Sequence, residues 1–218
     1  MGNGKRFLNR LRRKILTLFT GRCTFCHAPT KSASAICEEC KKKLESVGIP
    51  MVGRSYRIAC SCWYYDGIGK SMLLRYKFTG RWMLYLDPIA DGLIATYRKW
   101  LSGEKFDAVV SVPSFGVKET HLTPVLHRFC EETDLPFHPE YLTKVKKTAH
   151  QRDLSAAKRK TNLKNAFKAS ADAAGKRILL IDDIMTTGNT VRECSETLLR
   201  GGAASVTVLT AFKTKSPA

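Results

Sequence analysis

The sequence predicts an α/β protein in which helices flank a mainly parallel sheet and a small cysteine-rich module precedes it. Strand-like and helix-like segments alternate from about residue 57 onward, which is typical of parallel strands joined by right-handed helical crossovers. The run "ILLI" at residues 178–181 is continuously apolar, as expected for a strand that is buried on both faces. With 218 residues and 44% hydrophobic content, the chain is long enough for one medium domain and a small appendage.

The elements are expected in a regular order. Hydrophobic periodicity and turn residues predict a strand near 57–65, helices near 68–77 and 83–101, a strand at "FDAVVSVP" (106–113), a helix near 120–132, strands near 137–144 and 177–182, a helix over 189–200 and a last strand at "SVTVLTAF" (205–212). Gly201 and Gly202 mark the end of the last helix. The Gly- and Pro-containing stretch "VGIPMVG" (47–53) is interpreted as a linker, with a domain boundary near residue 50.

Residues 1–20 are predicted to form a short basic amphipathic helix. Apolar residues recur at helical spacing in "RFLNRLRRKILTLF" (6–19), and Arg and Lys fill the other face. Such a helix docks on its own protein, on a membrane surface or on nucleic acid, and the sequence leaves these alternatives open. The expected organisation is therefore this helix, a four-cysteine module over 21–50 and an α/β domain over 51–218.

Positive charge is concentrated in two segments. Lys and Arg number 37 against 19 Asp and Glu, which gives a formal net charge of +18. Residues 1–50 hold 11 basic and 3 acidic residues, and residues 141–168 hold 9 basic and 1 acidic residue, so the rest of the chain is nearly neutral. This excess indicates an anionic partner such as nucleic acid, a phosphorylated ligand or a membrane surface, unless both segments are merely solvated faces.

No secretory signal is recognised at the amino terminus, because Arg and Lys interrupt its apolar residues. No uninterrupted apolar stretch reaches the roughly 18 residues that a membrane span needs. We therefore expect a cytoplasmic protein, and the basic helix leaves a location at the inner face of the membrane open. In that compartment the eight cysteines are expected to be thiols or metal ligands rather than disulfides.

Four of these cysteines have the spacing of a metal site. The stretch "CTFCHAPTKSASAICEEC" (23–40) contains two CxxC pairs, each able to place two thiolates on one ion. Four sulfur ligands suit a closed, structural zinc site, and His27 is then surplus. Unrelated cysteines and a redox or iron–sulfur role are the competing interpretations. The predicted zinc ligands are Cys23, Cys26, Cys37 and Cys40; the other cysteines, Cys60, Cys62, Cys130 and Cys194, are expected to be small buried hydrophobes.

The stretch "ILLIDDIMTTGNT" (178–190) joins a buried strand to two carboxylates and a glycine-containing turn. Asp182 and Asp183 follow the apolar run, where open α/β sheets place their ligands, and can accept hydrogen bonds from sugar hydroxyls. The turn offers backbone amides and hydroxyls just before a helix, which suits a phosphate. Together they describe a cradle for ribose 5-phosphate; the alternative is that Thr187 or Asn189 simply caps the helix. The candidate phosphate-binding residues are Met185, Thr186, Thr187, Gly188, Asn189 and Thr190.

These thirteen residues resemble the phosphoribosyl-pyrophosphate motif of type I phosphoribosyltransferases across their whole length. Three further stretches are similar to the ComF family of competence-associated phosphoribosyltransferase-like proteins: the paired CxxC module, "YYDGIGKSMLLRYKFTGR" (64–81) and "KKTAHQRDLSAAKRKTNLKNAF" (146–167). The resemblance covers nearly the whole chain from about residue 18. The third stretch matches the family pattern at Lys147, Thr148, Gln151, Leu154, Arg159, Asn162 and Phe167.

The resemblance implies a type I phosphoribosyltransferase fold, with a five-stranded, mainly parallel core, a hood and a zinc-ribbon-like module ahead of it. It implies a flexible loop at about 146–165 that closes over phosphoribosyl pyrophosphate (PRPP) and Mg²⁺, while Asp182 and Asp183 serve the displacement of pyrophosphate at C1. Lys147 is a ligand-binding candidate in this loop, whose basic residues can neutralise a pyrophosphate. The candidates for nucleic-acid contact are Lys146, Lys147, Arg152, Lys158 and Arg159.

One loop departs from the family pattern. Where the family has a basic loop that contacts pyrophosphate, "SVPSFGVKETHLTPVLHRF" (111–129) has Lys118 as the only basic residue between Val112 and His121. Lys118 and Ser114 are the local candidates for that contact. Ordinary surface or core positions are expected for the histidines, which show no metal spacing or nucleophile partner: His121, His127, His138 and His150.

Three functions are compatible with these residues. The first is a ComF-like protein of DNA uptake in natural transformation that binds PRPP or ribose 5-phosphate and single-stranded DNA, with an uptake helicase or processing protein as partner. The second is a metabolic phosphoribosyltransferase that transfers ribose 5-phosphate to a base or amine. The third is a non-catalytic scaffold of the uptake machinery. The residues predict neither an acceptor nor an oligomeric state.

Overall fold

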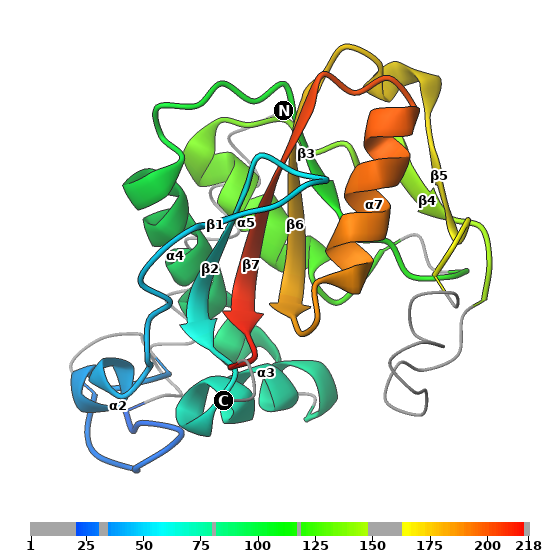
Figure 1. Ribbon diagram of the computed structural model, residues 1–218. Coiled ribbons are helices and arrows are strands. Elements are labelled where there is room, and N and C mark those ends of the chain that lie inside the picture. Colours follow the sequence, from blue (N-terminus) through cyan, green and yellow to red (C-terminus); the bar gives the residue numbers. More distant parts are fainter. Residues whose placement is uncertain (1–20, 31–34, 80–81, 117–118, 148–162, 216–218) are drawn as a thin grey trace. The chain divides into compact units, whose positions relative to one another are not determined.

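The computed structural model describes residues 21–30, 35–79, 82–116, 119–147 and 163–215 (Figure 1). Contacts group the chain into two compact units, Met1–Glu45 with Asp66–Ile89 and Ser46–Tyr65 with Ala90–Ala218. Residues 66–89 thus group with the cysteine module, although the sequence suggested a boundary near 50. The basic helix expected over 1–20, and most of the loop expected at 146–165, lie outside the described residues.

The larger unit contains a five-stranded sheet with the strand order β1-β2-β7-β6-β3. The pairs β2–β7, β7–β6 and β6–β3 are parallel, and β1 pairs with β2 in the antiparallel direction. The mainly parallel α/β sheet predicted from the sequence is therefore confirmed. The strands are β1 (Met51–Val52), β2 (Ile58–Tyr64), β3 (Ala108–Ser111), β6 (Arg177–Met185) and β7 (Ser205–Lys213).

The strand predicted near 137–144 is confirmed in part: Phe137 forms an isolated parallel bridge with Val109 of β3, and a strand is present only over Leu142–Lys144. This segment forms a 3-10 turn, η1 (Pro139–Tyr141), followed by β4 (Leu142–Lys144), which pairs with β5 (Phe167–Ala169) in a separate antiparallel pair. A proline cannot donate a ladder hydrogen bond and starts the turn instead. The fifth strand of the sheet is β1, which lies within the stretch interpreted as a linker. It was not predicted because two residues are too few to show a periodic pattern.

Helices cover both faces of this sheet. In Figure 1, α7 (Asn189–Arg200) lies on one face together with the β4–β5 pair, and α5 (Thr123–Thr133) lies on the other. Alternate strand residues such as Val110, Leu180 and Val208 are fully buried in one core cluster with Val191 and Leu198 of α7. A short 3-10 turn, η3 (Ala171–Ala173), precedes β6. Among the described residues, no helix combines the length and apolar character needed to span a membrane.

The smaller unit contains α2 (Glu38–Lys42), α3 (Gly67–Phe78) and the residues of α4 (Trp82–Trp100) up to Ile89. Arg75 on α3 donates a hydrogen bond of 2.6 Å from Nη1 to the Thr24 carbonyl and places its guanidinium 4.8 Å from the centre of the Phe25 ring. Phe25 in turn meets Tyr85 edge to face at 6.0 Å. The loop between the first two cysteines is thereby held by α3 and α4.

An ion pair aligns β3 with β6 at their amino-terminal ends. Arg177 donates to the Asp107 carboxylate from Nε (2.9 Å), from Nη2 (2.7 Å) and from its backbone N–H (2.8 Å). The Asp107 N–H returns a bond of 2.9 Å to the Arg177 carbonyl. The register of two parallel strands is constant along their length. The Asp107–Arg177 pair therefore helps to determine which residues of β3 and β6 lie at the carboxyl edge of the sheet.

Asp107→Asn is expected to lower the free energy of unfolding at neutral pH. The variant should also lose less of this free energy than the wild type when the pH is lowered into the acid range. The side chain and then the backbone N–H of Arg177 hold the pKa of Asp107 well below its ordinary value. A carboxylate of this kind stabilises the fold above the pKa of the unfolded chain, about 3.9, and loses its contribution as the pH falls through the folded-state pKa. Urea unfolding at a series of pH values should therefore show a shallower decline below about pH 4 in the variant.

Asp172→Asn is the matched control, because the Asp172 carboxylate hydrogen-bonds to the Ser170 hydroxyl rather than to a guanidinium. It should keep the wild-type acid dependence. If Asp107→Asn also keeps it, the ion pair does not stabilise the alignment of β3 with β6.

Candidate functional site

Strand β6 runs through both aspartates of the predicted motif and ends at Met185 rather than near residue 182. Successive strand residues point to opposite faces of a sheet. Asp183 is 7% exposed and contacts His121. Asp182 acts on the other side of the strand: the pKa of Cys194 on α7 is raised first by the burial of that thiol and then by the negative charge of Asp182. Asp182 Oδ1 also accepts a hydrogen bond of 2.9 Å from the Asp183 N–H. The two carboxylates therefore lie at one sheet edge but point to opposite faces of the sheet, Asp182 toward α7 and Asp183 toward the turn before α5.

The turn after β6 leads directly into α7. Gly188 is the N-cap residue, its φ is +73°, and no side chain caps the helix by a hydrogen bond. The alternative that Thr187 or Asn189 simply caps the helix is therefore wrong, and the glycine requirement comes from the left-handed backbone. The first amides of a helix lack intrahelical acceptors and carry positive partial charge, so this turn has the chemistry of an anion site.

Thr214, the residue after β7, holds this turn by two hydrogen bonds. The Thr214 N–H donates to the Met185 carbonyl (3.1 Å), and the Thr214 hydroxyl donates to the Thr186 carbonyl (3.2 Å). Met185 is buried, whereas Thr186 and Thr187 are exposed. The turn is thus fixed on its inner side and accessible on its outer side.

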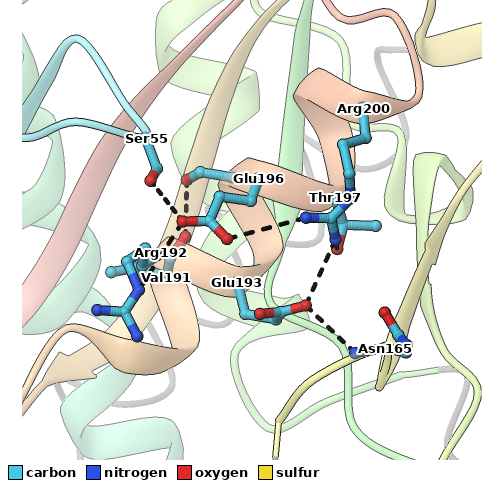
Figure 2. A network of polar contacts seen from close by, with 9 residues as sticks. Ser55, Asn165, Val191, Arg192, Glu193, Glu196, Thr197 and Arg200 are labelled. Atoms are coloured by element: carbon cyan, nitrogen blue, oxygen red, sulfur yellow. Dashed lines mark hydrogen bonds and ion pairs between the residues drawn. The ribbon is translucent and has the colours of Figure 1, made fainter. Parts of the chain in front are cut away.

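Polar contacts on α7 fasten the helix to two neighbouring segments (Figure 2). Glu196 accepts a hydrogen bond of 2.7 Å from the Ser55 hydroxyl, in the connection between β1 and β2. Glu193 accepts a bond of 3.3 Å from the backbone N–H of Asn165, which has a φ of +57°. Arg200 reaches both glutamates, at 3.4 Å and 3.8 Å. These contacts and the buried face of α7 keep the amino end of the helix against the edge of the sheet.

The four predicted metal ligands come together in the smaller unit. The sulfur atoms of Cys23, Cys26, Cys37 and Cys40 all lie within 4.8 Å of one another, and those of Cys26 and Cys37 are 3.5 Å apart. Tetrahedral zinc with Zn–S bonds of 2.3 Å would separate its sulfurs by about 3.8 Å. The cluster could therefore hold a metal ion, and its donor set fits structural zinc.

Backbone N–H groups surround these sulfurs. Cys37 is the N-cap of α2, and its sulfur accepts from the Cys40 N–H at 3.4 Å. Burial opposes ionisation of Cys23, but hydrogen bonds from backbone groups at Cys37, Cys26 and Phe25 outweigh it and lower its pKa to about 6. Such donors stabilise thiolates, the form in which cysteine binds metal.

The remaining cysteines match the prediction with one exception. Cys60, Cys62 and Cys194 are buried, and burial raises the pKa values of Cys60 and Cys62 to about 11 and about 12. Cys130, on α5, is only partly buried. None of the three buried thiols is expected to ionise at neutral pH.

One histidine was missed by the sequence interpretation. His121 Nε2 lies 2.5 Å from Asp183 Oδ2, so this histidine is part of the candidate site and not an isolated residue. The available signal was position, because a residue that follows β3 shares the carboxyl edge of the sheet with the motif. His138 instead pairs with Glu140 at 2.7 Å, and His127 packs against Phe137. His150 lies outside the described residues.

The predicted basic contacts are only partly described. Lys146 and Lys147 are exposed just after β4, and Ser114 is exposed after β3. The residues Lys118, Arg152, Lys158 and Arg159 lie outside the described parts of the chain.

Comparison with known proteins matches residues 85–218 to the phosphoribosyl transferase domain. The "DNA utilization protein YhgH" of Escherichia coli (strain K12) is 48% identical over 69 residues, which are 32% of this chain and 30% of the relative. "Competence protein F" of Haemophilus influenzae is 38% identical over 78 residues, 34% of each protein. These matches span about a third of the relatives' own length. "Competence protein ComFC" of Bacillus subtilis (strain 168) is 28% identical over 210 residues, 92% of this chain and 82% of the relative.

The family match includes β6, the glycine turn and α7, which form the candidate site. The relative that covers nearly the whole chain is a competence protein. The chain therefore belongs to the phosphoribosyl transferase domain family, as a ComF-family protein.

Proposed function

We propose that this ComF-family protein binds a phosphoribosyl ligand, PRPP or ribose 5-phosphate, at the carboxyl edge of its sheet. The observation that carries the proposal is the uncapped amino end of α7 beside two carboxylates. Backbone amides of the turn over 185–190 bind the 5′-phosphate, and Asp182 and Asp183 accept hydrogen bonds from the ribose hydroxyls. Lys147, exposed after β4, and Lys118 are further ligand contacts.

Active transfer to a base or amine is the second candidate, favoured by the presence of both motif carboxylates at the ligand-binding edge. Asp182 and Asp183 would then hold the ribose while pyrophosphate leaves C1, so that positioning and charge stabilisation supply the catalysis. Mg²⁺ bound with PRPP would neutralise the pyrophosphate charge. Pyrophosphate release in the presence of an acceptor distinguishes this function from binding alone.

We further propose that the protein binds single-stranded DNA and acts in DNA uptake. Its relatives are named for DNA utilization and competence. A net charge of +18 favours binding to a phosphate backbone, and the exposed Lys146 and Lys147 lie in one of the two basic segments. Arg152, Lys158 and Arg159 complete the proposed contact. A cytoplasmic location, at the inner face of the membrane, and an uptake helicase or processing protein as partner belong to the same proposal.

The four-cysteine cluster is proposed to hold zinc in a structural role, because four thiolates leave no open coordination position. The metal would add to the stabilisation that the loop receives from Arg75, the rings of Phe25 and Tyr85 and its own backbone hydrogen bonds. A scaffold that uses this module and the basic segments to hold uptake proteins is the alternative in which the phosphoribose cradle has no part.

Gly188→Ala is expected to weaken ribose 5-phosphate binding by about tenfold or more. A side chain at φ +73° costs about 1–2 kcal/mol, and relief of this strain moves the amides that face the phosphate. Titration calorimetry with ribose 5-phosphate and with PRPP, each with and without Mg²⁺, measures the effect.

Gly175→Ala is the matched control, because Gly175 has a φ of +71° in the turn before β6, at the opposite edge of the sheet. It should cost similar stability and leave the affinity unchanged. Wild-type protein that binds neither ligand would overturn the phosphoribose proposal.

Cys37→Ser is expected to reduce bound zinc to well below one ion per chain and to lower the thermal midpoint. Removing one of four thiolates opens the coordination shell, and metal binding is coupled to folding of such a module. Metal analysis by mass spectrometry and thermal unfolding with and without a chelator measure both effects. Cys130→Ser makes the same chemical change outside the cluster and should retain the zinc. Full zinc content in Cys37→Ser would contradict the four-ligand site.

Replacing Lys146 and Lys147 by alanine is expected to flatten the salt dependence of oligothymidylate binding. Each lost contact with single-stranded DNA lowers the slope of log affinity against log salt by about 0.7. Fluorescence anisotropy at several salt concentrations gives the slope. Replacing the exposed Lys105 and Lys176, which lie near the amino-terminal edge of the sheet, removes the same charge and should leave the slope unchanged. Equal effects of the two double variants would indicate a diffuse attraction without a defined contact.

A further inference from the structure

His121 contacts the second aspartate of the motif. Its Nε2 lies 2.5 Å from Asp183 Oδ2 across 62 residues of sequence. The Asp183 side chain is 9% exposed, whereas that of His121 is 39% exposed. An ionised carboxylate only accepts hydrogen bonds, so with Asp183 ionised the imidazole donates Nε2–H to Oδ2. The contact therefore joins a partly exposed donor to a carboxylate withdrawn from solvent.

The fold holds His121 firmly in this place. Strand β3 is paired with β6 up to Ser111 and Ile181, and the Val112 N–H continues the pairing with a bond of 3.0 Å to the Ile181 carbonyl. The chain then returns to the sheet edge in the turn before α5. Within this turn the Thr120 N–H donates to the Thr123 hydroxyl, and the Thr123 N–H donates to the Thr120 carbonyl, both at 3.0 Å.

The two residues on either side of His121, Thr120 and Leu122, are also informative. Leu122, the residue after His121, is 3% exposed, so the core fixes the backbone beside the imidazole. The Thr120 hydroxyl oxygen is buried without a hydrogen-bond partner among the described residues. Buried polar atoms are rarely left in this state, so the turn that carries His121 has the capacity for one more polar contact.

The chemistry of Asp183 depends on such a donor. Burial disfavours the charged form of a carboxylate, and a donated N–H favours it. Only the charged form accepts hydrogen bonds from sugar hydroxyls at both oxygens, and it offers about four lone-pair directions for them. A donor on one oxygen sets the rotation of the carboxylate and therefore the directions in which its oxygens can meet a ligand.

We infer that His121 is a positioning residue that holds the Asp183 carboxylate for the ribose hydroxyls and so makes the site selective for ribose over deoxyribose phosphates. The inference rests on the proposed binding of a phosphoribosyl ligand and identifies what discriminates among such ligands. The effect belongs to the sugar half of the site alone, because the turn over 185–190 binds phosphate through its own amides.

The test compares His121→Leu, which removes the donor and keeps the bulk, with His121→Gln, whose amide N–H can take the place of Nε2–H. Titration calorimetry uses ribose 5-phosphate, its 2-deoxy and 3-deoxy analogues and inorganic phosphate. His121→Leu is expected to bind ribose 5-phosphate about tenfold more weakly, to lose most of the preference over at least one deoxy analogue and to bind inorganic phosphate as the wild type does. His121→Gln should restore most of the affinity.

A double-mutant cycle separates positioning from a general structural role. Against an Asp183→Asn background, His121→Leu should cause no further loss of affinity for ribose 5-phosphate, because the group it orients has changed. His138→Leu is the matched control: it removes another histidine–carboxylate pair, His138 with Glu140 at 2.7 Å, away from the motif, and should leave all ligand affinities unchanged.

The outcomes are distinguishable. Unchanged ribose 5-phosphate affinity in His121→Leu, or an equal loss for inorganic phosphate, would overturn the inference and leave the phosphoribose proposal standing. Failure of the wild type to bind any of the sugar phosphates would overturn the phosphoribose proposal and, with it, the inference.

Discussion

The hydrogen-bonded position of β6 between β7 and β3 is the constraint on which the site depends. The strand pairs in parallel with both neighbours, and its apolar run over 178–181 is fully buried. A strand paired on both sides and covered on both faces cannot shift register without exposing its core residues. The carboxyl end of β6, with its two aspartates, is therefore fixed in space. The positions of the turn over 185–190 and of the amino end of α7 follow from the position of this strand end.

The elements around β6 place further polar groups beside its carboxyl end. The α7 helix packs on one face and is fastened by polar contacts to Ser55 and Asn165, so its amino end stays beside the strand end (Figure 2). On the other face, the chain after β3 returns with His121 against Asp183. The residues that could meet a sugar phosphate thus come from two different crossovers and are held by core packing and by the contact of His121 with Asp183.

The fold was largely predictable because most of its elements are long and periodic. The helix over 189–200 and the strands β2, β6 and β7 lie within a few residues of their predicted positions. The failures have local causes. Pro139 begins a 3-10 turn, so the strand predicted near 137–144 is reduced to its last three residues, and β1 is too short to leave a pattern. Cys130, expected to be buried, is only partly buried on α5.

The sequence by itself determined the parts of the site that are contiguous. Two aspartates, a glycine with a left-handed backbone and a helix start within thirteen residues carry their chemistry in local geometry, and the paired CxxC spacing does the same for the cysteine cluster. Only the tertiary structure decided that the two aspartates point to opposite faces of the sheet and that His121 meets Asp183. The reason is that strand pairing and crossover packing, which no local pattern records, bring together residues 62 positions apart.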